Sequence, residues 1–266
     1  VIVTRLLPGL IMTALWVLLL IFGPADLFWF VVTLIAVFGL YEYYKMTIAI
    51  PIGARLIQTI VFTLSPVLVA YFQRPELFMP ALFVSLIGII LLSLKYHKRF
   101  GHILLFLGFS SFGALYIGLC LAHMVLIRYL PQGASWLLVL TAVTAGGDTG
   151  AYYIGTNFGR RKLCPEISPG KTVEGAVGGI LVGSIAAVGM GMLLLPEYNP
   201  SVIFASALML SVVSIIGDLA ESVIKRSAGV KDSGTLLFGH GGVLDRVDGM
   251  LITAPVLYYL LALGIL

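Results

Sequence analysis

Apolar runs recur along the whole chain and are separated by short polar stretches. A helix needs roughly 17 to 25 mainly apolar residues to cross the hydrocarbon core of a bilayer, which is about 30 Å thick. Runs of this length predict transmembrane helices near residues 6–22, 27–44, 56–72, 77–94, 103–127, 135–156, 174–195, 201–224 and 247–266. The pattern therefore predicts an all-α fold, a polytopic transmembrane helix bundle with about nine spans.

The first and fifth of these spans carry local irregularities. The first follows Arg5, as a secretory signal would. No small-residue cleavage site follows it and further spans do, so we expect it to remain a span. Gly113 lies inside the fifth span and could interrupt its helix.

Composition supports the same class. The chain is 60% hydrophobic and only 11% charged, with a mean hydropathy of +1.08. These values exclude a water-soluble globule, because too few polar residues remain to cover its surface. Cys120 and Cys164 lack metal-ligand spacing, and we expect no disulfide between a span and a loop. Attraction to anionic lipid headgroups accounts for the net charge of +4, so we expect no nucleic-acid partner.

The basic residues predict an orientation. If the N-terminus is cytoplasmic, every Lys and Arg except Arg74 and Arg128 falls at the cytoplasmic side. Cytoplasmic connections of membrane proteins are enriched in such residues. We therefore expect a protein of the cell (inner, cytoplasmic) membrane whose long charged loops, and whose active site, face the cytoplasm.

Polarity divides the chain into two regions. Residues 1–130 carry their polar groups mainly at span ends and predict a scaffold that faces lipid; Glu42, among tyrosines, is interpreted as part of an interfacial belt. Residues 131–266 are richer in Gly, Ser and Thr and predict the catalytic region with its cytoplasmic loops. Gly175, Gly179 and Gly183 form a small-residue stripe that packs a helix, either within the subunit or across a homodimer.

Charged residues gather between residues 215 and 248. They are Asp218, Glu221, Lys225, Arg226, Lys231, Asp232, His240, Asp245, Arg246 and Asp248. Ionisable groups beside hydrocarbon are costly and mark a functional site by default. Helical spacing places Asp218, Glu221, Ser222 and Lys225 on one face of the eighth span, and Asp245 and Asp248 one turn apart at the start of the ninth.

Asp148 lies between glycines inside the sixth span. A carboxylate at that depth is expensive unless it meets a cation or a proton donor. We expect Asp148 to be buried and either to reach the same metal or nucleotide as Asp218, or to form a hydrogen bond that holds spans together.

Carboxylate and hydroxyl oxygens without clustered Cys or His favour Mg²⁺. The glycines around His240, namely Gly239, Gly241 and Gly242, would let backbone amides approach an anion, and the nearby Lys and Arg side chains would neutralise a polyphosphate. The segment Ser168-Pro169-Gly170-Lys171-Thr172 is similar to the end of a P-loop. It is not interpreted as a Walker motif, because Pro165 replaces the first glycine and no strand is expected there.

Two blocks of sequence resemble one family. The first block contains Ser222-Val223-Ile224-Lys225-Arg226, Lys231-Asp232-Ser233-Gly234 and His240-Gly241-Gly242-Val243-Leu244-Asp245-Arg246-Val247-Asp248. The second contains Asp148-Thr149-Gly150-Ala151-Tyr152 and Ser168-Pro169-Gly170-Lys171-Thr172-Val173-Glu174-Gly175. Together they resemble the phosphatidate cytidylyltransferases, or CDP-diacylglycerol synthases. The resemblance covers residues from about 140 to 250, and Phe238 departs from the family's usual Pro, Gly or Ser.

The resemblance implies Mg²⁺-dependent transfer of CMP from CTP to phosphatidic acid. Asp218 and Asp245 would hold the catalytic cation, with Asp248 and Asp148 available for a second cation. The expected catalytic residues are Asp218, Lys225, Asp245, Arg246 and Asp248. The expected binding residues are Asp148, Lys171, Ser222, Arg226, Lys231, His240, Gly241 and Gly242, with His240 orienting a phosphate or the loop.

Two other functions are compatible with buried acids in membrane helices. A cation- or proton-coupled transporter uses such residues, but here the acids crowd one membrane face and no inverted repeat is visible. A CDP-alcohol phosphotransferase also carries Asp-x-x-Asp, but its remaining motif does not follow Asp248.

Overall fold

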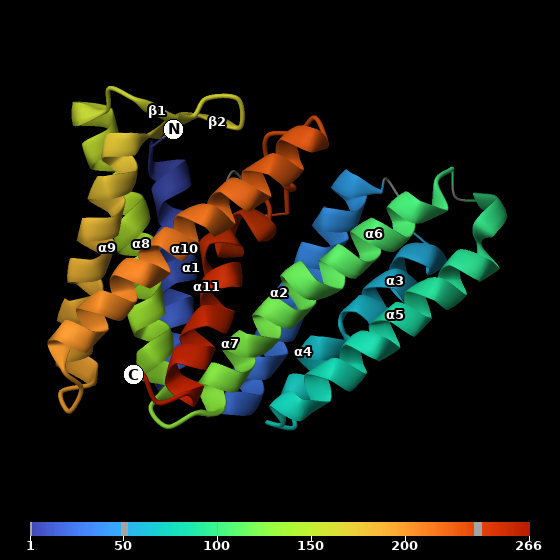
Figure 1. Cartoon of the computed structure of the whole chain (residues 1–266), viewed down its shortest axis with the longest axis horizontal. Coiled ribbons are helices and arrows are strands. Elements are labelled where there is room, and N and C mark those ends of the chain that lie inside the picture. The colour runs from blue at the N-terminus through green and yellow to red at the C-terminus, as the bar shows by residue number, and fades with distance from the viewer. Residues whose placement is uncertain (1, 49–52, 100, 237–240) are drawn as a thin grey trace. The chain divides into compact units, whose positions relative to one another are not determined.

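The computed structural model describes residues 2–48, 53–99, 101–236 and 241–266. Helices dominate it, which confirms a mainly helical fold (Figure 1). In chain order the elements are α1 Ile2–Phe22, α2 Ala25–Thr47, α3 Ala54–Thr63, α4 Ser65–Ala70, η1 Pro75–Leu77, α5 Phe78–Lys95, η2 His97–Arg99, α6 Ile103–Gly113, η3 Ala114–Leu119, α7 Cys120–Tyr129, α8 Gly133–Phe158, β1 Lys162–Cys164, β2 Ser168–Thr172, α9 Val173–Leu194, α10 Pro200–Ser227 and α11 Leu244–Ala262.

Each apolar run coincides with one helix or with two or three consecutive helical elements. Within the described residues, five helical stretches are long and apolar enough to cross a membrane: Ala25–Thr47, Pro75–Lys95, Ile103–Tyr129, Val173–Leu194 and Pro200–Ser227. These stretches indicate a membrane protein. The count of about nine spans and the cytoplasmic N-terminus stay predictions.

The chain forms two compact units. The first contains Val1–Tyr129 and Ala228–Arg246, and the second contains Leu130–Ser227 and Val247–Leu266. The connection that follows α10 therefore groups with the N-terminal helices rather than with the helix that precedes it.

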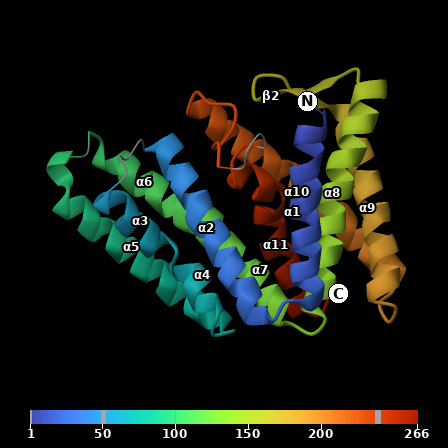
Figure 2. The same cartoon turned by 180° about the vertical axis from the view of Figure 1, so that it is seen from behind.

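In the first unit, α2 packs beside α6 and α7 (Figure 2). The Tyr43 hydroxyl donates to the Phe109 carbonyl oxygen at 3.1 Å, and the Tyr44 hydroxyl donates to the Ser110 carbonyl oxygen at 3.3 Å. Tyr43, Tyr44 and Glu42 are each at most 2% exposed, so the prediction that they form an interfacial belt is wrong. Tyr43 and Tyr44 are buried because α6 packs on this face of α2, whereas Glu42 is covered by the segment that precedes α11.

The helix is not interrupted at Gly113, but its hydrogen-bond pattern changes there. The α-helix α6 ends there, and η3, which is π-helical, begins at Ala114. A Cβ atom on Gly113 would lie 2.6 Å from the Tyr44 hydroxyl oxygen. The absence of a side chain at Gly113 thus lets Tyr44 of α2 lie against the junction of α6 and η3.

In the second unit, α8 and α9 lie side by side in both views (Figures 1 and 2). A Cβ atom on Gly179 would lie 2.7 Å from the Gly147 carbonyl oxygen, and one on Gly183 would lie 2.6 Å from the Val143 carbonyl oxygen. The glycine stripe therefore packs α9 against α8 within the chain. Glycines on both helices serve this close approach, and α8 runs unbroken past them.

A two-stranded antiparallel sheet was not predicted. Strand β1 pairs with β2, which continues directly into α9, so the expectation of no strand here is wrong, and the mainly helical fold includes this small sheet. Two contacts of the chain itself hold the hairpin. The Thr172 hydroxyl accepts from the Gly175 N–H at 3.1 Å and caps α9, and Glu174 accepts from the Arg160 N–H at 2.9 Å.

Candidate active site

A cavity of about 450 Å³ lies in the second unit. Helices α8, α9 and α10 and strand β2 line it, with glycines from α8 and α9 on its wall. Its charged lining residues are Asp148, Lys171 and Asp218. Three of the predicted site residues, from three separate elements, therefore surround one space.

Lys171 and Asp218 form an ion pair at this cavity. Lys171 is the last residue but one of β2, and Asp218 lies on α10. Their side chains are 27% and 31% exposed, so both are open to a ligand that enters. When a ligand enters, its phosphate can bind the lysine ammonium group, and a cation that comes with it can bind the carboxylate.

The prediction that Asp148 is buried is wrong, because its side chain is exposed and lines the cavity. The reason is the rotation of α8. Its glycine face, including Gly147 and Gly150, packs against α9, and this turns Asp148 away from the helix contact.

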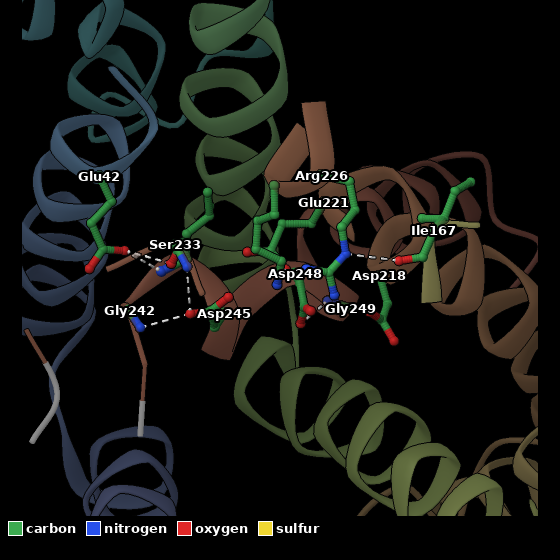
Figure 3. A network of polar contacts seen from close by, with 12 residues as sticks. Glu42, Ile167, Asp218, Glu221, Arg226, Ser233, Gly242, Asp245, Asp248 and Gly249 are labelled. Atoms are coloured by element: carbon green, nitrogen blue, oxygen red, sulfur yellow. Dashed lines mark hydrogen bonds and ion pairs between the residues drawn. The ribbon is translucent and has the colours of Figure 1, made fainter. Parts of the chain in front are cut away.

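Glu221 and Lys225 lie one helical turn apart on α10, and the lysine ammonium donates to Glu221 Oε2 at 3.0 Å. Glu221 is fully buried at 0% exposure. Asp248 of α11 lies close enough to Glu221 and to Asp218 for their negative charges to repel, and Figure 3 shows the three side chains. The buried Glu221 thus pairs with Lys225, and the half-buried Asp248 brings a second acid beside it, an arrangement that favours a further cation or a proton.

The other predicted residues of α10 have smaller local roles. Arg226 is exposed, and its Nε donates to the Ile167 carbonyl oxygen at 3.1 Å, which ties the end of α10 to the hairpin loop (Figure 3). Ser222 is half-buried on the same helix.

In the first unit, Asp245 organises the start of α11. Its Oδ2 accepts from the Ser233 N–H at 3.0 Å and from the Gly242 N–H at 2.7 Å (Figure 3). Gly241 has φ +81°, and a Cβ atom there would lie 2.6 Å from Asp245 Oδ2. The Gly242 amide, expected to face a bound anion, is engaged here by a carboxylate of the chain itself. Lys231 and Arg246 are exposed.

Comparison with known proteins identifies the family. A sequence model described as the cytidylyltransferase family matches residues 3–264. The chain belongs to this family. The phosphatidate cytidylyltransferase of Bacillus subtilis (strain 168) is 44% identical over 157 residues, 59% of this chain and 58% of that protein.

Two further relatives agree in extent. The protein YnbB of Escherichia coli (strain K12) is 43% identical over 144 residues, 52% of this chain and 48% of that protein. The phosphatidate cytidylyltransferase of Brucella suis biovar 1 (strain 1330) is 44% identical over 155 residues, 57% of this chain and 56% of that protein. The chain thus spans about half the length of the curated relatives it matches. The resemblance of its motifs to phosphatidate cytidylyltransferases is confirmed.

The predicted site of this cytidylyltransferase-family chain is distributed over both units. The second unit contains Asp148, Lys171, Asp218, Ser222, Lys225, Arg226 and Asp248, and the first contains Lys231, Gly241, Gly242, Asp245 and Arg246. His240 lies outside the described residues, as do Phe238 and Gly239. Within the described residues no three His, Cys, Asp or Glu side chains are grouped closely enough to hold a metal by themselves. Joint metal binding by Asp218 and Asp245 stays a prediction.

Sequence reasoning gave no role at the site to two acids of this family member. Glu221 was placed on the polar stripe of α10, and its spacing from Asp218 and Lys225 was the signal that could have found it. Glu42 contacts the segment before α11, which is far from it in sequence. No local pattern could have indicated that contact.

Proposed function

We propose that this chain is an integral membrane nucleotidyltransferase that transfers CMP from CTP to phosphatidic acid and gives CDP-diacylglycerol and pyrophosphate. Its membership of the cytidylyltransferase family and the names of its relatives support this proposal. The observation that carries it is the cavity in which Lys171, Asp218 and Asp148 face one space, beside helices apolar enough for a bilayer.

The reaction needs little acid–base chemistry. A phosphate oxygen of phosphatidic acid attacks the α-phosphorus of CTP, and the bond to the β-phosphate oxygen breaks, so that pyrophosphate leaves with the bonding electrons. The attacking phosphate is already deprotonated near neutral pH, so no strong general base is required. Phosphoryl transfer depends mainly on positioning and on neutralising charge. A site rich in cations and acids, without a Ser-His-Asp arrangement, suits this demand.

The cationic residues are proposed to bind phosphates. Lys171, paired with Asp218, would move to a phosphate of CTP when that acid binds a cation. Lys225, Arg226 and Arg246 would neutralise the phosphates of CTP and of the lipid, with Lys231 at the rim and His240 orienting a phosphate.

The residues fit a magnesium ion. Mg²⁺ takes oxygen ligands and is usually held by one or two protein carboxylates together with substrate phosphates, so a dedicated cage of three acids is not needed. Glu221 and Asp248 place two acids beside Lys225, so a further positive charge would be favourable there. We propose Asp218 and Asp248 as ligands, with Asp148 and Asp245 as further ligands or for a second cation; Asp245 would bind through Oδ1, because Oδ2 accepts two backbone N–H groups. When bound, the ion would neutralise negative charge on the triphosphate.

A lipid substrate and a cytoplasmic nucleotide meet only at a membrane surface. We therefore propose an enzyme of the cytoplasmic (inner) membrane whose site faces the cytoplasm, and its motifs suggest phospholipid biosynthesis as its role.

Radiolabelled CTP separates the proposed function from its alternatives. Purified protein in mixed micelles of detergent and phosphatidic acid should convert CTP, with Mg²⁺ present, to labelled CDP-diacylglycerol and pyrophosphate in equal amounts. A CDP-alcohol phosphotransferase would instead consume CDP-diacylglycerol together with an alcohol. A transporter would form no product in either mixture, and that result would overturn the proposal.

A further inference from the structure

Glu42 is a buried acid in an apolar helix. It lies near the end of α2 and is only 2% exposed. A carboxylate removed from water is destabilising unless hydrogen bonds or opposite charge compensate it. Its surroundings therefore indicate what keeps it there.

The compensation comes from the segment that precedes α11. Glu42 Oε2 accepts from the Ser233 hydroxyl and from the Leu244 N–H, each at 3.0 Å, and Oε1 accepts from the Val243 N–H at 3.0 Å (Figure 3). Leu244 is the first residue of α11. The N-terminus of a helix carries partial positive charge, so the carboxylate is also favoured electrostatically.

Two glycines allow the chain to close around this carboxylate. A Cβ atom on Gly234 would lie 2.4 Å from Glu42 Oε1, and one on Gly242 would lie 2.4 Å from Oε2. Any side chain at either position would push the carboxylate away from its donors. The glycines of this motif thus serve the contact with α2.

Ser233 links Glu42 to Asp245. Its hydroxyl donates to Glu42, and its backbone N–H donates to Asp245 Oδ2. Gly242 donates to the same Asp245 oxygen and lies against Glu42. The two acids therefore hold Ser233 and Gly242 to the first turn of α11.

We propose that Glu42 is a positioning residue that fixes the start of α11 and so sets the placement of Asp245 and Arg246. This proposal rests on the proposed function, in which Asp245 binds the cation and Arg246 neutralises phosphates. A helix of the N-terminal region thereby contributes to catalysis without touching a substrate.

The variant Glu42→Gln tests the proposal with almost no change in size. Each carboxylate oxygen faces a backbone N–H, so the amide group of glutamine sets its own N–H₂ against Val243 or Leu244 in either orientation. Hydrogen bonds to charged groups are the stronger kind, and losing one from a positioned segment should lower kcat roughly 10- to 100-fold. The KM for CTP should change by less than about threefold, because the loss appears mainly in the transition state.

Two further variants complete the kinetic test. Asp26→Asn, on the same helix, removes an exposed acid that accepts a hydrogen bond from the Tyr129 hydroxyl at 3.3 Å, and it should keep the kcat of the parent protein. Ser233→Ala removes one donor to Glu42 and keeps the acid. It should lower kcat less, and the double variant should lose less than the product of the two single losses, because both remove one contact. Should Glu42→Gln fail to fold, Ser233→Ala alone decides, and a kcat equal to that of the parent overturns the proposal.

A readout without substrate separates this proposal from the proposed function. Hydrogen–deuterium exchange at the Val243 or the Leu244 amide, whichever faces the glutamine N–H₂, should be at least about tenfold faster in Glu42→Gln than in Asp26→Asn, because a hydrogen-bonded amide exchanges through local opening and loss of its bond makes that opening easier. If the parent protein transfers no CMP, the proposed function fails. Hydrogen–deuterium exchange then still tests whether Glu42 positions the start of α11. Unchanged exchange at both amides, or unchanged kcat in an active protein, overturns it.

Discussion

The contact between α8 and α9 gives a prediction that can be worked from distances. In Gly179→Ala the added methyl group would lie 2.7 Å from the Gly147 carbonyl oxygen and 3.1 Å from the Ala151 Cβ atom. A backbone oxygen cannot rotate away as a flexible side chain can, so the helices must separate by several tenths of an ångström. Overpacking of this kind costs about 1–3 kcal/mol.

The control lies in the same helix. Gly189 has nothing within 4 Å of its Cβ position, so Gly189→Ala meets no clash and gains about 1 kcal/mol from the helix preference of alanine over glycine. Comparing the two variants cancels that preference and leaves the packing cost alone. Gly179 also lines the cavity, and the shift should widen it beside Asp148.

Thermal unfolding of the detergent-solubilised protein, followed by tryptophan fluorescence, measures the difference. With a Tm change of about 2–4 °C per kcal/mol for a chain of this size, Gly179→Ala should unfold about 2–12 °C below Gly189→Ala. An equal or higher Tm for Gly179→Ala would refute the close helix contact and the reasoning built on it.

Three other changes test the site. Asp218→Asn should abolish CMP transfer while leaving the protein extractable and its Tm within about 2 °C of the parent, since a half-exposed ion pair contributes little to stability; near-normal turnover would contradict the metal assignment. Lys225→Met leaves the buried Glu221 without the lysine that donates to it and should destabilise the protein by about 3 kcal/mol in thermal unfolding, and adding Glu221→Gln should recover much of this loss. Gly241→Ala should lower kcat at least about tenfold, because its methyl group clashes with Asp245 and alanine disfavours the positive φ. Gly229→Ala, also at positive φ (+71°), has no atom within 4 Å of its methyl group and should keep the kcat of the parent protein. Equal kcat values in the two variants would contradict the steric argument.

Local patterns in the sequence were enough for the helices. Apolar run length depends only on neighbouring residues, and so does the spacing that puts Asp218, Glu221 and Lys225 on one face of α10. The family motifs likewise lie in continuous stretches. The sequence for these reasons predicted the class, most helix positions, the charged cluster and the family.

Tertiary structure decided which of these residues meet. Glu42 and Ser233 are separated by 191 positions and Lys171 and Asp218 by 47, and no periodic pattern links such pairs. The hairpin of β1 and β2 escaped prediction because Pro and Gly in β2 disfavour a strand, while pairing with β1 and the cap on α9 hold it. Tertiary packing also decided the exposure of Asp148, because the contact of the α8 glycines with α9 sets the rotation of α8. Local sequence fixes what each segment is, but packing between distant segments decides which polar groups are covered and which face a ligand.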